Sequence, residues 1–78
     1  MQVNENLVKS IIANKIGVSE NEITNATKLV ADLGADSLDV VEISMAMERE
    51  FNVTLSEDET AKVVTVGDII AAINSHLN

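Results

Sequence analysis

The sequence predicts an all-α fold, a small four-helix bundle with three longer helices, a short third helix and a long first loop. The 78 residues include no proline and a single aromatic side chain, Phe51, which is unlike a β fold. Four segments carry apolar residues at three- and four-residue steps, the period of an α-helix. A chain of this length is expected to form one domain, spanning residues 1–78.

The first helix is expected to begin near Val3, because apolar residues recur at helical steps from there to Ile16. Gly17 follows, and glycine readily adopts the left-handed conformation that ends a helix. A loop of about 20 residues then runs to Asp36, which is long for a compact domain and suggests a function or packing of its own. Residues 19–22 have the spacing of a capping box and are expected to form a single turn. Four apolar residues of the loop are expected to hold it against the bundle: Ile23, Leu29, Val30 and Leu33.

The other three helices are expected in the second half of the chain. The second runs over about 37–51, and Asn52 is placed to end it. The third is short, over about 57–62, and the fourth carries one apolar stripe from Val66 to Leu77. The third and fourth each open with a capping box, in which a side chain and an acid three residues later satisfy exposed backbone N–H groups. The two boxes are Ser56 with Glu59 and Thr65 with Asp68.

The chain is strongly acidic, with 13 acidic and 5 basic side chains and a net charge of −8 at pH 7. Residues 36–59 contain eight of the acids and one basic residue, Arg49, so nearly all of the net charge lies there. This charge repels nucleic acid and anionic lipid, and a basic protein partner is therefore expected. With no leader pattern and no apolar run long enough to enter a membrane, we expect a soluble cytoplasmic protein.

The residues needed for catalysis are missing from the sequence. The absence of cysteine excludes disulfides, thiolate metal sites and a thiol nucleophile. Ser37 as a nucleophile would need a base, and the only histidine, His76, lies near the C-terminus, where it is expected to be solvated. We therefore expect no enzymatic activity.

The second helix is expected to have two apolar faces. Its core face comprises Val40, Ile43, Met47 and Phe51. A second stripe lies more than about 90° away and comprises Leu38, Val41 and Met45, with Glu42 and Glu48 beside it. An apolar stripe framed by acids suits a surface that docks a basic partner. The alternative is that this stripe packs beneath the long loop.

The start of the second helix presents a candidate modification site. Asp36 is expected to cap the helix by accepting a hydrogen bond from the backbone N–H of Asp39. Ser37 is then the first helical residue, with its hydroxyl near the positive end of the helix dipole, where an attached anion is favoured. From the residues alone, Ser37 is either an ordinary helix-start serine or a modification site.

A family resemblance separates these two interpretations. The run Asp-Leu-Gly-Ala-Asp-Ser-Leu-Asp at residues 32–39, continued as Val-Val-Glu-Ile-Ser-Met-Ala-Met-Glu to Glu48, resembles the prosthetic-group site of acyl carrier proteins of dissociated, type II fatty acid synthesis. The helix order, short third helix, length and acidity are also similar to that family, over essentially the whole chain. The resemblance implies that Ser37 is joined by a phosphodiester to 4′-phosphopantetheine, transferred from coenzyme A by a holo-carrier synthase.

The resemblance further implies a carrier rather than a catalyst. The thiol of the arm carries the growing acyl chain as a thioester, and the family shelters that chain between its helices. Residues 37–51 match the family's recognition helix, which docks on basic patches of fatty acid synthesis enzymes, and a monomer is expected. The implied partner-binding residues are Asp36, Leu38, Asp39, Val41, Glu42, Met45 and Glu48.

Three residues depart from the family pattern. Arg49 stands where an acid is usual, and Ser44 replaces a branched aliphatic residue and is expected to loosen the packing. Ala31 replaces a carboxylate that helps some members bind a divalent cation, so no metal site is expected. Two alternatives remain: a discrete carrier for polyketide, nonribosomal peptide or cell-envelope acylation, and an unmodified acidic helical module that docks basic partners.

Overall fold

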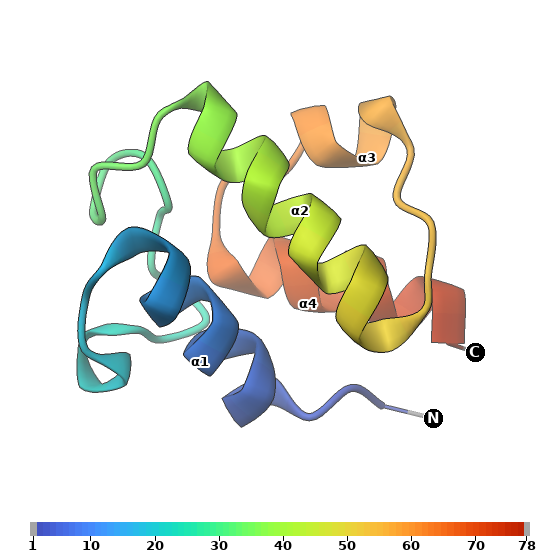
Figure 1. Cartoon of the computed structure of the whole chain (residues 1–78), viewed down its shortest axis with the longest axis horizontal. Helices are drawn as coiled ribbons and strands as arrows, with labels where there is room; N and C mark the ends of the chain where they lie inside the picture. Colours follow the sequence, from blue (N-terminus) through green and yellow to red (C-terminus); the bar gives the residue numbers. More distant parts are fainter. Residues whose placement is uncertain (1, 78) are drawn as a thin grey trace.

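A computed structural model describes residues 2–77 and shows four α-helices among them (Figure 1). They are α1 (Glu5–Ile16), α2 (Ser37–Phe51), α3 (Glu57–Ala61) and α4 (Val66–Leu77), and the first loop contains one 3₁₀ turn, η1 (Glu20–Glu22). The predicted bundle of three longer helices and a short third is confirmed. Outside the helices, an isolated β-bridge pairs Lys28 with Thr65. No helix within residues 2–77 has the length and apolar character needed to cross a membrane.

Two helix boundaries differ from the prediction. α1 begins at Glu5 rather than near Val3, because the side chain of Asn4 caps the helix by accepting a backbone N–H from its first turn. Val3 precedes the helix but is still buried, and its N–H donates to Asn74 Oδ1 of α4 at 2.7 Å. α3 ends at Ala61, one residue earlier than expected.

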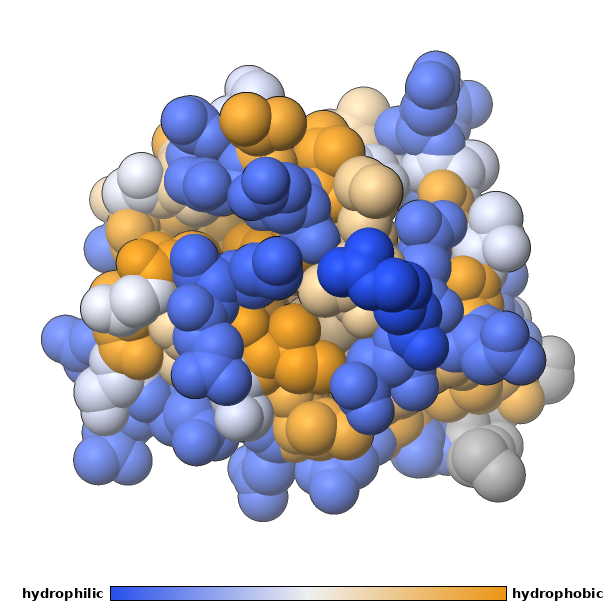
Figure 2. Space-filling view, viewed as in Figure 1, coloured by the Kyte–Doolittle hydropathy of each residue, from blue (hydrophilic) through white to orange (hydrophobic). Residues whose placement is uncertain are grey.

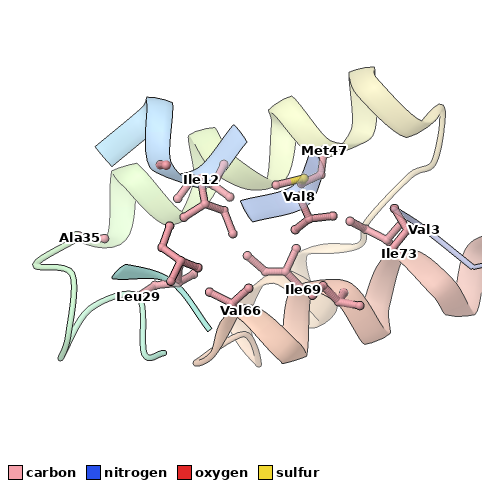
Figure 3. Packing of buried hydrophobic residues seen from close by; sticks show 13 residues of the cluster. Val3, Val8, Ile12, Leu29, Ala35, Met47, Val66, Ile69 and Ile73 are labelled. Atoms are coloured by element: carbon pink, nitrogen blue, oxygen red, sulfur yellow. The ribbon is translucent and has the colours of Figure 1, made fainter. Parts of the chain in front are cut away.

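α2 is the central helix of the bundle and contacts α1, α3 and α4. It crosses the front of the molecule in Figure 1, with α4 behind it. Its predicted core face is confirmed, since Ile43 and Met47 are fully buried and Val40 and Phe51 are partly buried against the core. Burial of one such aliphatic side chain contributes about 1.5–3 kcal/mol. The core also draws on the chain before α1, the first loop, α1 and α4, through residues labelled in Figure 3: Val3, Val8, Ile12, Leu29, Ala35, Val66, Ile69 and Ile73.

The first loop is held to the bundle by apolar and backbone contacts. Leu29 and Ile23 are buried, and Leu33 is half-buried. The backbone N–H of Leu29 also donates to the carbonyl of Val64, just before α4, at 3.0 Å. The prediction for Val30 was wrong, because its side chain is 59% exposed. Leu29 and Val30 are neighbours in one turn, and with Leu29 turned into the core, Val30 faces outward.

Candidate functional site

The first turn of α2 presents Ser37 to solvent. Asp36 Oδ1 accepts the backbone N–H of Asp39 at 2.9 Å, and Asp39 Oδ2 accepts that of Asp36 at 3.1 Å. This reciprocal capping box confirms Asp36 as the N-cap and Ser37 as the first helical residue. Gly34, in the left-handed conformation at φ 75°, turns the chain into the helix. The exposed Ser37 therefore lies at the positive end of the α2 dipole.

The second apolar stripe of α2 is exposed, as the partner-docking interpretation requires. Leu38, Val41 and Met45 expose 65%, 44% and 49% of their surface, respectively. The alternative that they pack beneath the long loop is wrong. Figure 2 shows hydrophobic residues lying between hydrophilic ones on the face that α2 crosses. Glu42 is also exposed, so an apolar ridge with an acid beside it faces solvent.

The acids around this ridge are not neutralised by cations of the chain itself. Among the described residues, the only contact within 4.0 Å between a basic side chain and an acidic one joins Glu59 to His76, which is charged only when protonated. Arg49, on the exposed side of α2, makes no such contact with an acid of residues 2–77. Glu48 is half-buried, and its Oε2 accepts the backbone N–H of Leu55 at 2.9 Å, which fixes the connection between α2 and α3. The acidic surface is therefore available to positive charge from outside the molecule.

An open cavity of about 570 Å³ lies between α2 and α3, with Ser37 in its lining. Its volume is within the range of small-molecule sites. The α2 side of the lining repeats at helical steps and consists of Ser37, Val40, Val41, Ser44, Met45 and Glu48. The rest comes mainly from α3 and the chain on either side of it, and from the first loop, through Leu55, Glu57, Thr60, Ala61, Val63 and Val30. Most of these residues are apolar, so the cavity suits an apolar ligand with a polar end near Ser37.

Ser44 introduces a polar group into this apolar wall. The residue is only 4% exposed, and its Oγ has no hydrogen-bond partner among the described residues. A helical serine commonly donates to the carbonyl one turn earlier, but Ser44 does not. Leaving a buried hydroxyl unpaired costs about 1–3 kcal/mol. The sequence identified Ser44 as a departure from the family pattern but not as an unpaired group beside a cavity.

The wall formed by α3 is tied to α4 through Glu59. Glu59 Oε1 accepts the backbone N–H of Ser56 at 3.0 Å, completing the predicted capping box, and Glu59 Oε2 lies 2.8 Å from His76 Nε2. The backbone N–H of Ser56, followed by the His76 side chain, lowers the pKa of Glu59. His76 is exposed, as predicted, but its contact with Glu59 was not predicted. No local pattern links two residues 17 positions apart, so only the fold reveals this pair.

Candidate metal ligands are not clustered in this structure. Within residues 2–77, no three side chains of His, Cys, Asp or Glu are grouped so that they could hold a metal ion. The carboxylates of Asp36 and Asp39 are instead engaged in the cap of α2.

The fold is similar to those of solved acyl carrier proteins. A protein of Mycobacterium tuberculosis assigned as an acyl carrier protein is 28% identical, with a TM-score of 0.85, and the match covers 91% of this chain and 95% of that one. An acyl carrier protein of Thermotoga maritima is 27% identical, with a TM-score of 0.79 and coverage of 91% and 82%. The apo doublet acyl carrier protein from prodigiosin biosynthesis, 24% identical, has a TM-score of 0.79 with coverage of 91% and 34%, and supports the fold alone.

A family model described as the phosphopantetheine attachment site matches residues 6–73, which is most of the chain. Proteins of this family hold 4′-phosphopantetheine covalently, and acyl carrier proteins use it to carry acyl chains. The exposed serine at the start of α2 and the cavity beside it fit such an arm. We conclude that this chain belongs to the phosphopantetheine attachment site family and, within it, to the acyl carrier proteins.

Proposed function

We propose that the chain carries the growing acyl chain of fatty acid biosynthesis, as a thioester on 4′-phosphopantetheine attached to Ser37. The main observation behind this proposal is the position of Ser37, which is exposed at the N-terminus of α2 and also lines the 570 Å³ cavity. A phosphodiester at this position is favoured by the helix dipole. The thiol of the arm supplies the thioester chemistry that a chain without cysteine lacks.

The cavity between α2 and α3 is the proposed shelter for the acyl chain. Moving an alkyl chain from water into it gains about 0.8 kcal/mol for each buried CH₂ group. α3 is suited to widen the cavity, because it has five residues and none of them is fully buried. Its displacement therefore exposes little apolar surface of its own, and its tie to α4 through Glu59 and His76 is polar and near the surface.

The acidic and apolar face of α2 is the proposed docking surface for partner enzymes. The contributing residues are Asp36, Leu38, Asp39, Val41, Glu42, Met45 and Glu48. Because the surface acids attract a basic patch over a distance, they raise the association rate while the contacts stay individually weak. Rapid release suits a monomeric single-domain carrier that visits many enzymes, among them the holo-carrier synthase.

Attachment is tested by intact mass after the protein is incubated with coenzyme A and a holo-carrier synthase. The wild type is expected to gain one phosphopantetheinyl group and Ser37→Ala none. Ser75→Ala is the control, because Ser75 is an exposed serine on α4 that does not line the cavity. Equal modification of the wild type and Ser37→Ala would overturn the assignment of Ser37.

Docking is tested with two variants that change the charge equally. Glu42→Lys reverses an exposed acid on α2, and Glu20→Lys reverses one in η1, outside the acidic segment. Glu42→Lys is expected to slow association with the synthase several-fold at low salt, with the difference shrinking as salt is added. Equal slowing by both variants would mean that overall charge, and not the α2 surface, governs docking.

The fatty acid pathway is supported by the Asp36-Ser37-Leu38-Asp39 run and by the concentrated negative charge. The holo protein is expected to support chain elongation by purified type II fatty acid synthesis enzymes. If those enzymes did not elongate the holo protein, but a polyketide or nonribosomal peptide enzyme acylated it, the fatty acid pathway would be rejected in favour of the alternative carrier role.

A further inference from the structure

We propose that Ser44 makes the cavity selective for acyl chains that carry an oxygen function, such as 3-oxo or 5-oxo chains, over saturated chains of equal length. This inference rests on the proposed carrier function and concerns which acyl chains the cavity shelters best. Its basis is the combination of a lining residue of the cavity with a buried, unpaired hydroxyl.

The helical geometry places Ser44 within the cavity wall. The α2 residues that line the cavity run from Ser37 to Glu48, and Ser44 lies between these ends. At 100° per residue, Ser44 points within about 20° of the direction of Ser37, two turns earlier. Along the axis the two residues are about 10 Å apart, at 1.5 Å per residue. A chain that enters beside Ser37 and follows α2 therefore passes Ser44.

The surroundings of Ser44 explain why its partner would come from the ligand. Val40 and Val41 precede it on the cavity side of α2, Met45 follows it, and Val63 lines the cavity beyond α3. None of these side chains offers a hydrogen-bond acceptor of ordinary strength. Glu48, one helical turn after Ser44, also lines the cavity, but its Oε2 accepts the backbone N–H of Leu55, and Ser44 Oγ bonds to no group of the described residues. The unpaired hydroxyl thus matches a ligand that is apolar along most of its length and has one oxygen.

The number of polar groups favours the acyl chain over the phosphopantetheine arm as the partner of Ser44. The arm carries two amides and a hydroxyl, which need several partners if they are buried together. Ser44 Oγ is the only buried side-chain nitrogen or oxygen without a partner among residues 2–77, so it suits a single oxygen. Ser44 Oγ exposes almost no surface, so the proposal requires that a loaded chain widen the gap between α2 and α3 to reach it.

The test compares loaded forms of the full chain. Wild type, Ser44→Ala, Ser44→Thr and Ser75→Ala are each loaded at Ser37 with octanoyl, 3-oxooctanoyl or 5-oxooctanoyl arms, and the hydrolysis of each thioester at one fixed, mildly alkaline pH is timed by intact mass. The hydrolysis rate of Ser44→Ala is divided by that of the wild type for each chain. For at least one oxo chain, this ratio is expected to be about two- to tenfold larger than for octanoyl, which is the range expected for one hydrogen bond. Ser44→Thr keeps the hydroxyl and is expected to retain the protection. Ser75→Ala is expected to behave like the wild type.

The result also separates this inference from the proposed function. If the mass spectrum shows no arm on Ser37, the proposed function and this inference both fail. If the arm loads but Ser44→Ala changes oxo and saturated chains equally, only this inference is overturned. Equal rate changes in Ser44→Ala and Ser75→Ala would overturn it as well, because the effect would then not depend on the cavity. Comparing octanoyl with the oxo chains also detects a bond to the arm itself, which would affect all three and contradict the proposal.

Discussion

Replacing Ser44 with alanine is expected to stabilise the unloaded protein, although the residue is buried next to the core. The substitution removes a hydroxyl whose unpaired burial costs about 1–3 kcal/mol. Alanine also has the higher helix propensity, which adds a few tenths of a kcal/mol within α2. Taking the lower part of this range, the free energy of unfolding rises by about 1.5 kcal/mol. For a domain of this size, that corresponds to a rise in Tm of about 6–12 °C.

The measurement is thermal unfolding of the unloaded wild type, Ser44→Ala and Ser75→Ala, followed by circular dichroism. Ser75→Ala makes the same chemical change in a helix, but Ser75 is exposed and its Oγ donates to the carbonyl of Ala72 at 2.8 Å. Its Tm is expected to stay within about 2 °C of the wild type, as for most surface substitutions. A Tm for Ser44→Ala no higher than that of Ser75→Ala would refute the reasoning, because the Ser44 hydroxyl would then carry no burial cost.

Three further predictions concern the core, the acids and α3. Ile69→Ala, at a fully buried site in α4, is expected to lower the free energy of unfolding in urea by about 2–5 kcal/mol. Val41→Ala, at an exposed site on α2, is expected to lower it by less than about 0.5 kcal/mol. Similar losses for the two variants would contradict the assignment of Ile69 to the core and of Val41 to the surface. Added salt is expected to raise Tm at neutral pH, because it screens the eight acids of residues 36–59, and a Tm that salt leaves unchanged would contradict this. Folding lowers the pKa of Glu59 below its ordinary value of 4.5, so the ionised carboxylate stabilises the folded state. This stabilisation is fully present above pH 4.5 and is lost as the pH falls through the lower pKa of the folded state. Glu59→Gln should therefore be less stable than the wild type at pH 7 and equally stable in strong acid. If the difference in stability between the two proteins did not change with pH, ionisation of Glu59 would be excluded as the cause of that difference.

The local features of the fold were predictable because they depend on residues close together in the sequence. A capping box needs only two residues three positions apart, so the starts of α2, α3 and α4 could be recognised from Asp36, Ser56 and Thr65. The two faces of α2 follow from helical periodicity in the same way. The exposure of Leu38 was decided by the fold, because periodicity alone does not show whether the loop covers a second apolar stripe.

The features that the sequence did not predict depend on contacts between distant segments. The cavity exists because of where α3 lies relative to α2, and five residues of helix contain no pattern that specifies this position. The pair of Glu59 with His76 joins α3 to the end of α4. Ser44 was recognised as unusual, but its lack of a partner is a property of its surroundings and not of its position in the chain.

The bond from the Val3 N–H to Asn74 Oδ1 has a practical consequence for attaching this protein to others. It holds the segment before α1 beside the last turns of α4, and in Figure 1 both lie on the opposite side of the molecule from the start of α2. A tag, a surface tether or a second domain joined at either end would thus extend away from Ser37. Such fusions should leave the serine and the face of α2 open, so that several copies could be linked in tandem with each attachment point still within reach of an enzyme.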